Sequence, residues 1–312
     1  MKSELIICYF KLLLALLLWA GVVFVVRKLL TYTNIYLIAD IRYAVSAIIL
    51  LLWYKIKKGY FLPKLNIKQW VGVLLVGFFG IIFYNLLFFS ALKLISGSVY
   101  AMIFALCPSI TTIIAIFLFK INFNRYTIIG ILFSLIATLM LISAISPHCH
   151  QYLCVDFLND GIGWGEILAF LATIAFALFT ICNSYAHRLG VLPLDINVYA
   201  TVFGLVGLII VSTFYIHDFK EVVAIIVMPK EFWFCVFYMT FLATVLAYVW
   251  YSQAISKIGV AVTSVLQNTM PLQTVIIGCF IVGDIMPFRA FIAGGLILIG
   301  VYITHFSLRK KI

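Results

Sequence analysis

Apolar runs of about 20 residues recur along almost the whole chain, with only short polar breaks between them. An α-helix rises 1.5 Å per residue, so about 20 apolar residues cross the roughly 30 Å hydrocarbon core of a bilayer. Lipid forbids an open strand edge, and the two-residue alternation of a membrane barrel is absent, so each run is predicted to be a helix. Ten membrane-spanning helices are expected, at 10–29, 34–54, 69–92, 98–119, 126–144, 163–187, 192–216, 230–254, 260–282 and 288–307.

Composition leads to the same class of protein. The chain is 66% hydrophobic and 10% charged, and a soluble domain of 312 residues would have too little polar surface to cover itself. The predicted fold class is therefore an all-α integral membrane protein. The first run is interpreted as a retained helix, because it is long and no small-residue cleavage site follows it.

The first five runs resemble the last five when the sequence is shifted by 163 positions. The shift pairs Pro108 with Pro271 and Thr111 with Thr274, in register inside apolar runs. Five crossings is an odd number, so the second copy must enter the bilayer from the opposite side. The ten helices are thus predicted to form two inverted five-helix repeats, an arrangement found in many secondary transporters.

The basic residues indicate how the chain is oriented. With ten crossings, 14 of the 21 Lys and Arg residues fall on one side of the membrane and 6 on the other. The net charge of +11 thus follows the topology and forms no cluster for nucleic acid. The positive-inside rule puts both termini in the cytoplasm, and we assign the chain to a bacterial inner membrane. The expected division is a first repeat at 1–144, an extracytoplasmic loop at 145–162 and a second repeat at 163–312.

Short motifs in both halves carry a family resemblance. They include Trp19-Ala20-Gly21 and Arg42-Tyr43 in the first repeat, and Gly165-Glu166 and Gly283-Asp284 in the second. In these motifs the chain resembles the drug/metabolite transporter superfamily and, within it, the ten-helix EamA-like transporters. The resemblance implies transport of small molecules. The chain departs from the family pattern at Lys120 and Ile121, where an acidic residue is usual, and at Phe176, where a tryptophan is common.

Arg42 is the one basic residue that the count of 14 and 6 leaves over, and it lies deep inside a predicted helix. It lies about eight residues into the second helix, roughly 12 Å along its axis. A guanidinium at this depth could anchor the carboxylate or phosphate of a solute through paired donors. Alternatively, Arg42 pairs with Asp40 or another acid, or extends to the nearer membrane surface.

The ninth helix holds the densest polar cluster of any apolar segment, at Gln267, Asn268 and Thr269. Pro271 cannot donate a hydrogen bond, so it leaves free a carbonyl about one turn earlier, near Gln267. Irregular helices of this kind hold substrate near the bilayer midplane in transporters. The competing interpretation is that the amides hydrogen-bond between helices and only pack them together.

The other candidates are aromatic or acidic. Phe104 occupies the repeat position that matches Gln267, and Pro108 is predicted to break its helix as Pro271 does. The solute-binding set is completed by Trp19, Tyr84, Asn85, Tyr248 and Tyr251. Glu166 is the candidate for proton coupling, because a carboxyl in an apolar setting can titrate near neutrality. As an acid at the start of a helix, it could instead simply favour the helix dipole.

The predicted outer loop contains His148, Cys149, His150 and Cys154. A Cys149–Cys154 disulfide and a metal site both stay open, although the spacing matches none of the usual zinc patterns. The five histidines all lie at helix ends or in loops. This distribution argues against an integral-membrane enzyme acting on a lipid-linked substrate, which needs acid-base or metal chemistry at membrane depth.

The predicted function is a secondary transporter for a small organic metabolite, an amino acid or related amphipathic solute. In alternating access, one five-helix bundle would rock against the other. No phosphate-cradling glycine loop is present, so direct drive by ATP is not expected. No cofactor and no metal are predicted, and the expected partners are the solute and the lipid bilayer, with a homodimer left open.

Overall fold

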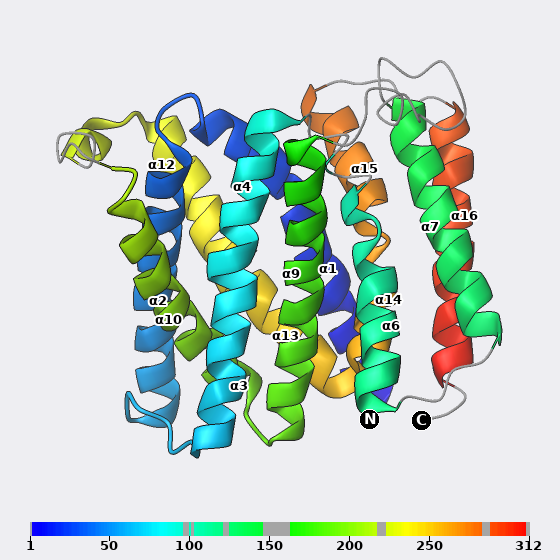
Figure 1. Ribbon diagram of the computed structural model, residues 1–312, viewed down its shortest axis with the longest axis horizontal. Helices are drawn as coiled ribbons and strands as arrows, with labels where there is room; N and C mark the ends of the chain where they lie inside the picture. The colour runs from blue at the N-terminus through cyan, green and yellow to red at the C-terminus, as the bar shows by residue number, and fades with distance from the viewer. Residues whose placement is uncertain are drawn as a thin grey trace. The chain divides into compact units, whose positions relative to one another are not determined.

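The computed structural model describes residues 2–95, 100, 103–120, 125–145, 163–216, 223–282 and 288–309 (Figure 1). These residues form helices and turns, without strands. Some of the sequence-based predictions concern residues that lie outside the described ones, namely His148, Cys149, His150, Cys154 and Asp284.

The first half contains α1 (Lys2–Leu29), α2 (Ile35–Lys58), α3 (Ile67–Gly77), η1 (Phe78–Phe83), α4 (Tyr84–Leu94), α6 (Cys107–Phe119) and α7 (Arg125–Ile145). The second half contains α9 (Trp164–Arg188), α10 (Pro193–Ser212), η2 (Ile225–Val227), α12 (Lys230–Phe237), η3 (Tyr238–Leu246), α13 (Ala247–Ile258), α14 (Val260–Gln267), α15 (Met270–Val282) and α16 (Phe288–Arg309). Within the described residues, seven stretches are long and apolar enough to cross a membrane, and three shorter apolar helices accompany them. The protein is therefore an all-α integral membrane protein.

The helix boundaries repeat along the chain at the spacing seen in the sequence. Residues 163 positions apart begin α3 and α12, α4 and α13, α6 and α15, and α7 and α16. Figure 1 shows the counterparts α7 and α16 running in opposite directions. The ten helices thus form two inverted five-helix repeats.

Two of the predicted helices contain a wide π-helical segment in their middle. The third helix runs α3–η1–α4, and its counterpart, the eighth, runs α12–η3–α13. In a π-segment each amide bonds five residues back, which inserts an extra residue into the turn and re-aims the side chains that follow. The sequence pattern predicted neither segment.

Two other predicted helices are interrupted. The ninth is predicted over 260–282 with a break at Pro271, and in the structure α14 ends at Gln267 and α15 begins at Met270, with a turn at Asn268 and Thr269. In the fourth, a turn at Ala105–Leu106 precedes α6. Pro108 and Pro271 lie at the start of the helices that follow these turns. In the first turn of a helix a backbone N–H has no acceptor within the helix, so a proline there loses no hydrogen bond.

The chain packs into two compact units, and each takes residues from both repeats. Unit 1 contains residues 1–85 and 178–257, and unit 2 contains residues 86–177 and 258–312. The compact units therefore do not coincide with the two predicted five-helix repeats. The physical reason is that each unit packs its apolar faces across the repeats, so similarity in sequence does not define the packing unit.

In unit 1, α2 lies antiparallel to α10. Tyr36 near the start of α2 stacks on Tyr215, just after the end of α10, and Tyr54 near the end of α2 meets Tyr199 near the start of α10. The Asn34 side chain caps the first turn of α2 through the amide of Leu37 at 3.0 Å. This cap fixes where α2 begins and so places Arg42 two turns inside it.

In unit 2, α7 packs closely on α16. A Cβ at Gly300 would lie 2.6 Å from the backbone nitrogen of Ser134, so only glycine permits this approach. The α6 and α14 helices meet through the hydroxyls of Thr112 and Ser264, which are 3.3 Å apart. These contacts build the core that holds the amide cluster of the ninth helix.

Candidate functional site

Arg42 is buried in unit 1, with 7% of its surface exposed. Its Nε donates to the hydroxyl of Thr244 in η3 at 2.7 Å, and its guanidinium carbon lies 5.0 Å from the centre of the Tyr43 ring. Among the described residues no acidic side chain pairs with Arg42, and the side chain does not extend to the surface. The predicted alternative, an ion pair between Arg42 and Asp40, is not formed, and Asp40 instead interacts with Ser212.

An aromatic cluster joins α1, α9 and α13 within unit 1. The ring of Trp19 lies 5.2 Å from that of Tyr248 and 4.9 Å from that of Tyr251. Phe179 of α9 contacts both tyrosines, at 5.7 and 6.2 Å. The hydroxyl of Tyr251 lies 3.2 Å from that of Thr180. The structure thus brings together three of the residues that the sequence singled out.

The π-segments position this cluster. The indole nitrogen of Trp19 donates to the carbonyl of Ala243 in η3 at 2.9 Å. Within η3, the hydroxyl of Thr244 donates to the carbonyl of Met239 at 2.8 Å. Thr244 thus links the π-segment to Arg42. Because π-segments distort regular helix hydrogen bonding, their carbonyls are available to side chains, and such segments are frequent at functional sites.

Asn85 belongs to the same group of residues. Its amide donates to the hydroxyl of Tyr43 at 3.0 Å and to the carbonyl of Ile81 in η1 at 2.7 Å. Tyr248 lies within electrostatic reach of Arg42, Tyr43 and Tyr84. Six of the predicted binding residues are therefore connected in unit 1, at the level of its two π-segments: Trp19, Arg42, Tyr84, Asn85, Tyr248 and Tyr251.

Sequence reasoning missed several members of this group. Thr244 and Phe179 were not selected, because neither a lone threonine nor a lone phenylalanine stands out in so apolar a chain. Tyr43 was noted only as part of the arginine-aromatic motif. Its position directly after Arg42 was the available signal, since the structure uses it to contact both Arg42 and Asn85.

A second group of predicted residues lies in unit 2. Gln267 and Asn268 are both 3% exposed, at the turn between α14 and α15. The Asn268 amide donates to the hydroxyl of Ser134 in α7 at 2.8 Å. This bond connects two helices, as the packing interpretation of the amides requires, so Asn268 has a structural partner whatever its role in transport.

Phe104 also lies in unit 2. It stacks on Tyr100 at 5.8 Å between ring centres and meets the edge of Phe176 at 5.4 Å. Phe176 is the residue that stands where the family often has tryptophan, and the structure keeps an aromatic ring in contact at that place. The position just before α6 is thus aromatic where its counterpart before α15 is rich in amides.

Glu166 lies in the first turn of α9, half-buried. Its Oε2 accepts from the backbone N–H of Gly163 at 3.1 Å. This geometry satisfies one of the free amides at a helix start and places negative charge at the positive end of the helix dipole. The structure thus gives Glu166 a capping role, which is the alternative that the sequence left open.

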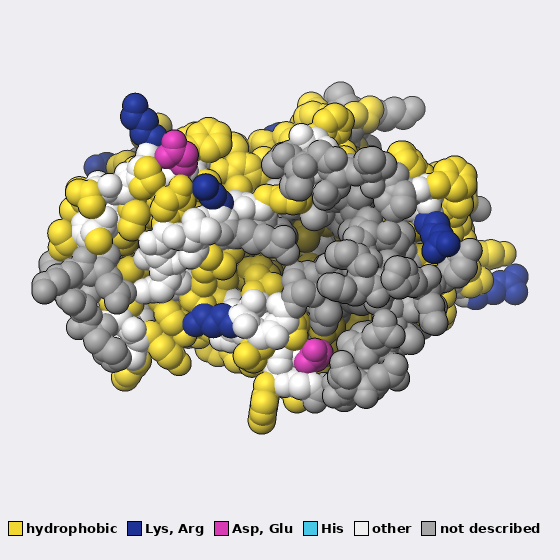
Figure 2. Space-filling model, turned by 90° about the horizontal axis from the view of Figure 1, so that it is seen from above, with side chains coloured by type: hydrophobic (Ala, Val, Ile, Leu, Met, Phe, Trp, Pro, Cys, Tyr) yellow, Lys and Arg dark blue, Asp and Glu magenta, His cyan; other side chains and the backbone are white. Residues whose placement is uncertain are grey.

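Potential metal ligands do not gather in the described part of either group. Within the described part of the chain, no cluster of three or more His, Cys, Asp or Glu side chains could hold a metal ion. Figure 2 shows a face on which, among the side chains that are not grey, hydrophobic ones predominate.

Comparison with known proteins agrees with this arrangement. The sequence model of the EamA-like transporter family matches residues 6–143 and 163–306. The uncharacterized transporter YyaM of Bacillus subtilis (strain 168) is 30% identical over 260 residues, which cover 83% of this chain and 81% of that protein. The uncharacterized transporter YetK of the same organism is 24% identical over 282 residues, or 89% of this chain and 79% of that protein.

A protein of known crystal structure has the same fold. The two align with a TM-score of 0.72 over 98% of this chain and 99% of the other, at 17% sequence identity. The family and the named relatives are transporters, which removes the membrane-enzyme alternative. Since the family's sequence model matches both halves, this chain, a multi-pass membrane transporter, belongs to the EamA-like transporter family.

Proposed function

We propose that this transporter is a secondary carrier for a small organic solute that bears an anionic group, such as an amino acid or a related amphipathic metabolite. It would act by alternating access in a bacterial inner membrane, with both termini in the cytoplasm. The observation that carries the proposal is Arg42, a buried arginine whose described partners are a hydroxyl and an aromatic ring.

The energetics of Arg42 support an anionic solute. A charged side chain at membrane depth costs about 2.5–3.5 kcal/mol on insertion scales, so it needs a counter-ion or a polar cavity. The described residues supply Arg42 with no counter-ion. The single Nε bond to Thr244 leaves the two terminal nitrogens of the guanidinium, which match the two oxygens of a carboxylate.

The surrounding side chains support an amphipathic solute. Trp19, Tyr248 and Tyr251 provide aromatic faces for an apolar body, and tyrosine hydroxyls add donors and acceptors beside them. In unit 2, Gln267, Asn268 and Phe104 are retained as candidate contacts. A bare inorganic ion would make little use of so much aromatic surface.

The first experiment measures uptake and efflux in proteoliposomes, with and without a pH gradient, for amino acids, nucleoside derivatives and quaternary amines. For a transported anionic solute, Arg42→Gln should raise the half-saturation concentration by about 30-fold or more, because breaking a buried charge pair costs 2–5 kcal/mol. Arg42→Lys should raise the half-saturation concentration by an intermediate amount, since lysine keeps the positive charge but lacks the paired donors of the guanidinium.

Arg125→Gln is the matched control. Arg125 lies 5.3 Å from the ring of the next residue, Tyr126, much as Arg42 lies 5.0 Å from that of Tyr43, but Arg125 is exposed at the start of α7. Transport by this variant should stay within twofold of the wild type. Unchanged transport by Arg42→Gln, or a panel in which only cations move, would refute the proposed anionic solute.

Proton coupling is proposed at Glu166. Glu166→Gln removes the titratable group and keeps an oxygen that can accept from the Gly163 amide, so the start of α9 should be preserved. Loss of the response to a pH gradient, with exchange of solute retained, is the expected result. A pH-gradient response equal to that of the wild type would leave Glu166 with capping alone.

A further inference from the structure

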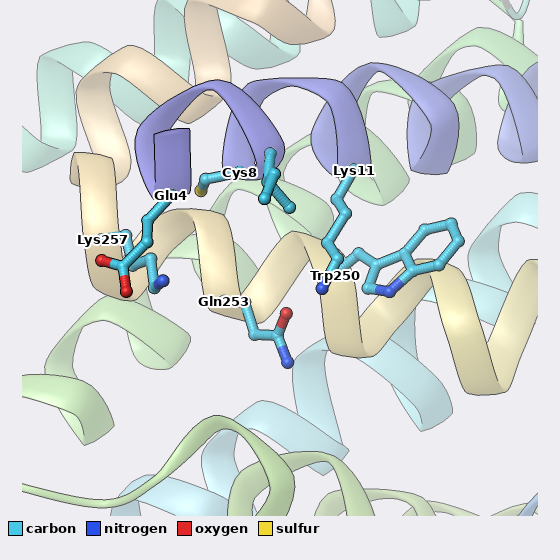
Figure 3. Close-up of a pocket in the computed structure, with 7 residues that line it drawn as sticks. Glu4, Cys8, Lys11, Trp250, Gln253 and Lys257 are labelled. Atoms are coloured by element: carbon cyan, nitrogen blue, oxygen red, sulfur yellow. The ribbon is translucent and has the colours of Figure 1, made fainter. Parts of the chain in front are cut away.

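A small open pocket lies between the first turns of α1 and the last turns of α13, both in unit 1 (Figure 3). It belongs to neither group of predicted solute contacts. Its lining consists of Glu4, Ile7, Cys8 and Lys11 from α1 and Trp250, Gln253 and Lys257 from α13. Figure 3 shows Lys257 beside Glu4 and Lys11 beside Trp250, with the Gln253 amide between the two pairs.

The polar groups of this pocket are arranged for an anion. The ammonium groups of Lys11 and Lys257 both interact electrostatically with the thiol of Cys8, so two cations flank the same small space. No described acidic side chain forms an ion pair with either lysine. Within the described residues, the Trp250 indole and the Gln253 amide also have no hydrogen-bond acceptor. One carboxylate, Glu4, leaves the lining with a net charge of +1.

The place of the pocket indicates where the anion comes from. The apolar span of the first helix begins at Glu4, and that of the eighth ends at Ile258, so the pocket lies at one end of both spans. Lipid phosphates are found at this depth. Ile7 of the pocket lining is apolar and exposed, and the same α1 turns also expose Ile6 and Phe10, a surface suited to acyl chains.

We propose that this pocket binds the phosphodiester group of an anionic phospholipid. The phosphate oxygens accept from Lys11, Lys257 and the Trp250 indole, and the acyl chains leave the pocket past Ile7 and lie against the exposed apolar surface of the α1 turns. A phosphodiester carries a single negative charge, which matches the net charge of the lining. Glu4 opposes a second negative charge and so disfavours a phosphate monoester.

Bound lipid would tie α1 to α13. Further along, the same two helices bring Trp19 into contact with Tyr248 and Tyr251. The pocket and the aromatic cluster are therefore both formed by α1 and α13. The inference is independent of the solute, since it concerns lipid at the membrane surface and not transport specificity.

The test is lipid binding by the purified full chain, measured by native mass spectrometry with phosphatidylglycerol, phosphatidylcholine and glycerol 3-phosphate as probes. The wild type should retain phosphatidylglycerol in preference to phosphatidylcholine. The double variant Lys11→Gln/Lys257→Gln should bind phosphatidylglycerol about 25-fold more weakly, since each lysine near an anionic lipid contributes roughly fivefold.

The control is Lys57→Gln/Lys58→Gln, which removes the same charge from the end of α2, outside the pocket. It should bind phosphatidylglycerol within twofold of the wild type. Equal losses in the two double variants would mean diffuse surface charge and would overturn the site. Equal retention of both lipids, or full displacement of phosphatidylglycerol by glycerol 3-phosphate, would overturn the lipid assignment.

Discussion

Replacing Gly80 by alanine should disturb the aromatic cluster of Trp19, Phe179, Tyr248 and Tyr251, because the added methyl group would collide with Phe179. Gly80 lies in η1, and a Cβ built on it would stand 2.2 Å from Cδ2 of Phe179 and 2.9 Å from Cε2 and Cγ. An ordinary contact is 3.4–4 Å, so the ring must move by roughly 1 Å. Phe179 is 2% exposed and stacks on Tyr251, so it can move only into its neighbours.

Overpacking of this kind costs about 1–3 kcal/mol. Alanine has a higher helix propensity than glycine by up to about 1 kcal/mol, which offsets part of that cost. We therefore expect Gly80→Ala to lower the free energy of unfolding by about 1–2 kcal/mol. Since Phe179 also contacts Tyr248, the variant should impair solute uptake as well.

The assay is unfolding in mixed micelles of a mild detergent and dodecyl sulfate, followed by tryptophan fluorescence. Gly295→Ala is the matched control, because a Cβ there meets nothing within 4 Å, and it should be neutral or slightly stabilising. In a Phe179→Leu background the cost of Gly80→Ala should shrink, since the ring that it strikes is gone. An unchanged cost in that background, or no cost in the wild type, would refute the argument.

Two further perturbations test the hydrogen bonds of the candidate residues. Trp19→Phe removes the donor to Ala243 and should cost about 1–3 kcal/mol of stability, whereas Trp164→Phe, at an exposed position, should cost little in the same assay. Asn268→Ala and Ser134→Ala break one 2.8 Å bond, so a double-mutant cycle should give a coupling of about 0.5–1.5 kcal/mol. Additive effects would mean that this bond stabilises nothing.

The fold was predictable to within a few residues because its signals are local. The predicted helix at 126–144 corresponds to α7 at Arg125–Ile145, and the one at 288–307 to α16 at Phe288–Arg309. The length of an apolar run and the chemistry of proline decide such boundaries. The predicted helix at 260–282 is interrupted by a turn at Asn268 and Thr269, next to Pro271, which the sequence predicted to break it.

The candidate site was predictable as a list of residues but not as an arrangement. Arg42 stood out because charge is rare at membrane depth, but its partner Thr244 is 202 positions away and carries no local signal. The π-segments η1 and η3 were likewise invisible, because a widened turn leaves the composition of a helix unchanged. They decide which side chains reach Arg42 and Trp19.

The sequence by itself determined that this chain crosses a membrane about ten times and is duplicated with inverted topology, because span length, parity and matched prolines are one-dimensional properties. Only the tertiary structure decided that each compact unit takes residues from both repeats, and that Arg42 meets Thr244 and not an acid. A membrane helix that is apolar on all sides has no polar stripe to mark its outer face. Its rotation, and therefore its partners, are set by packing against distant segments of the chain.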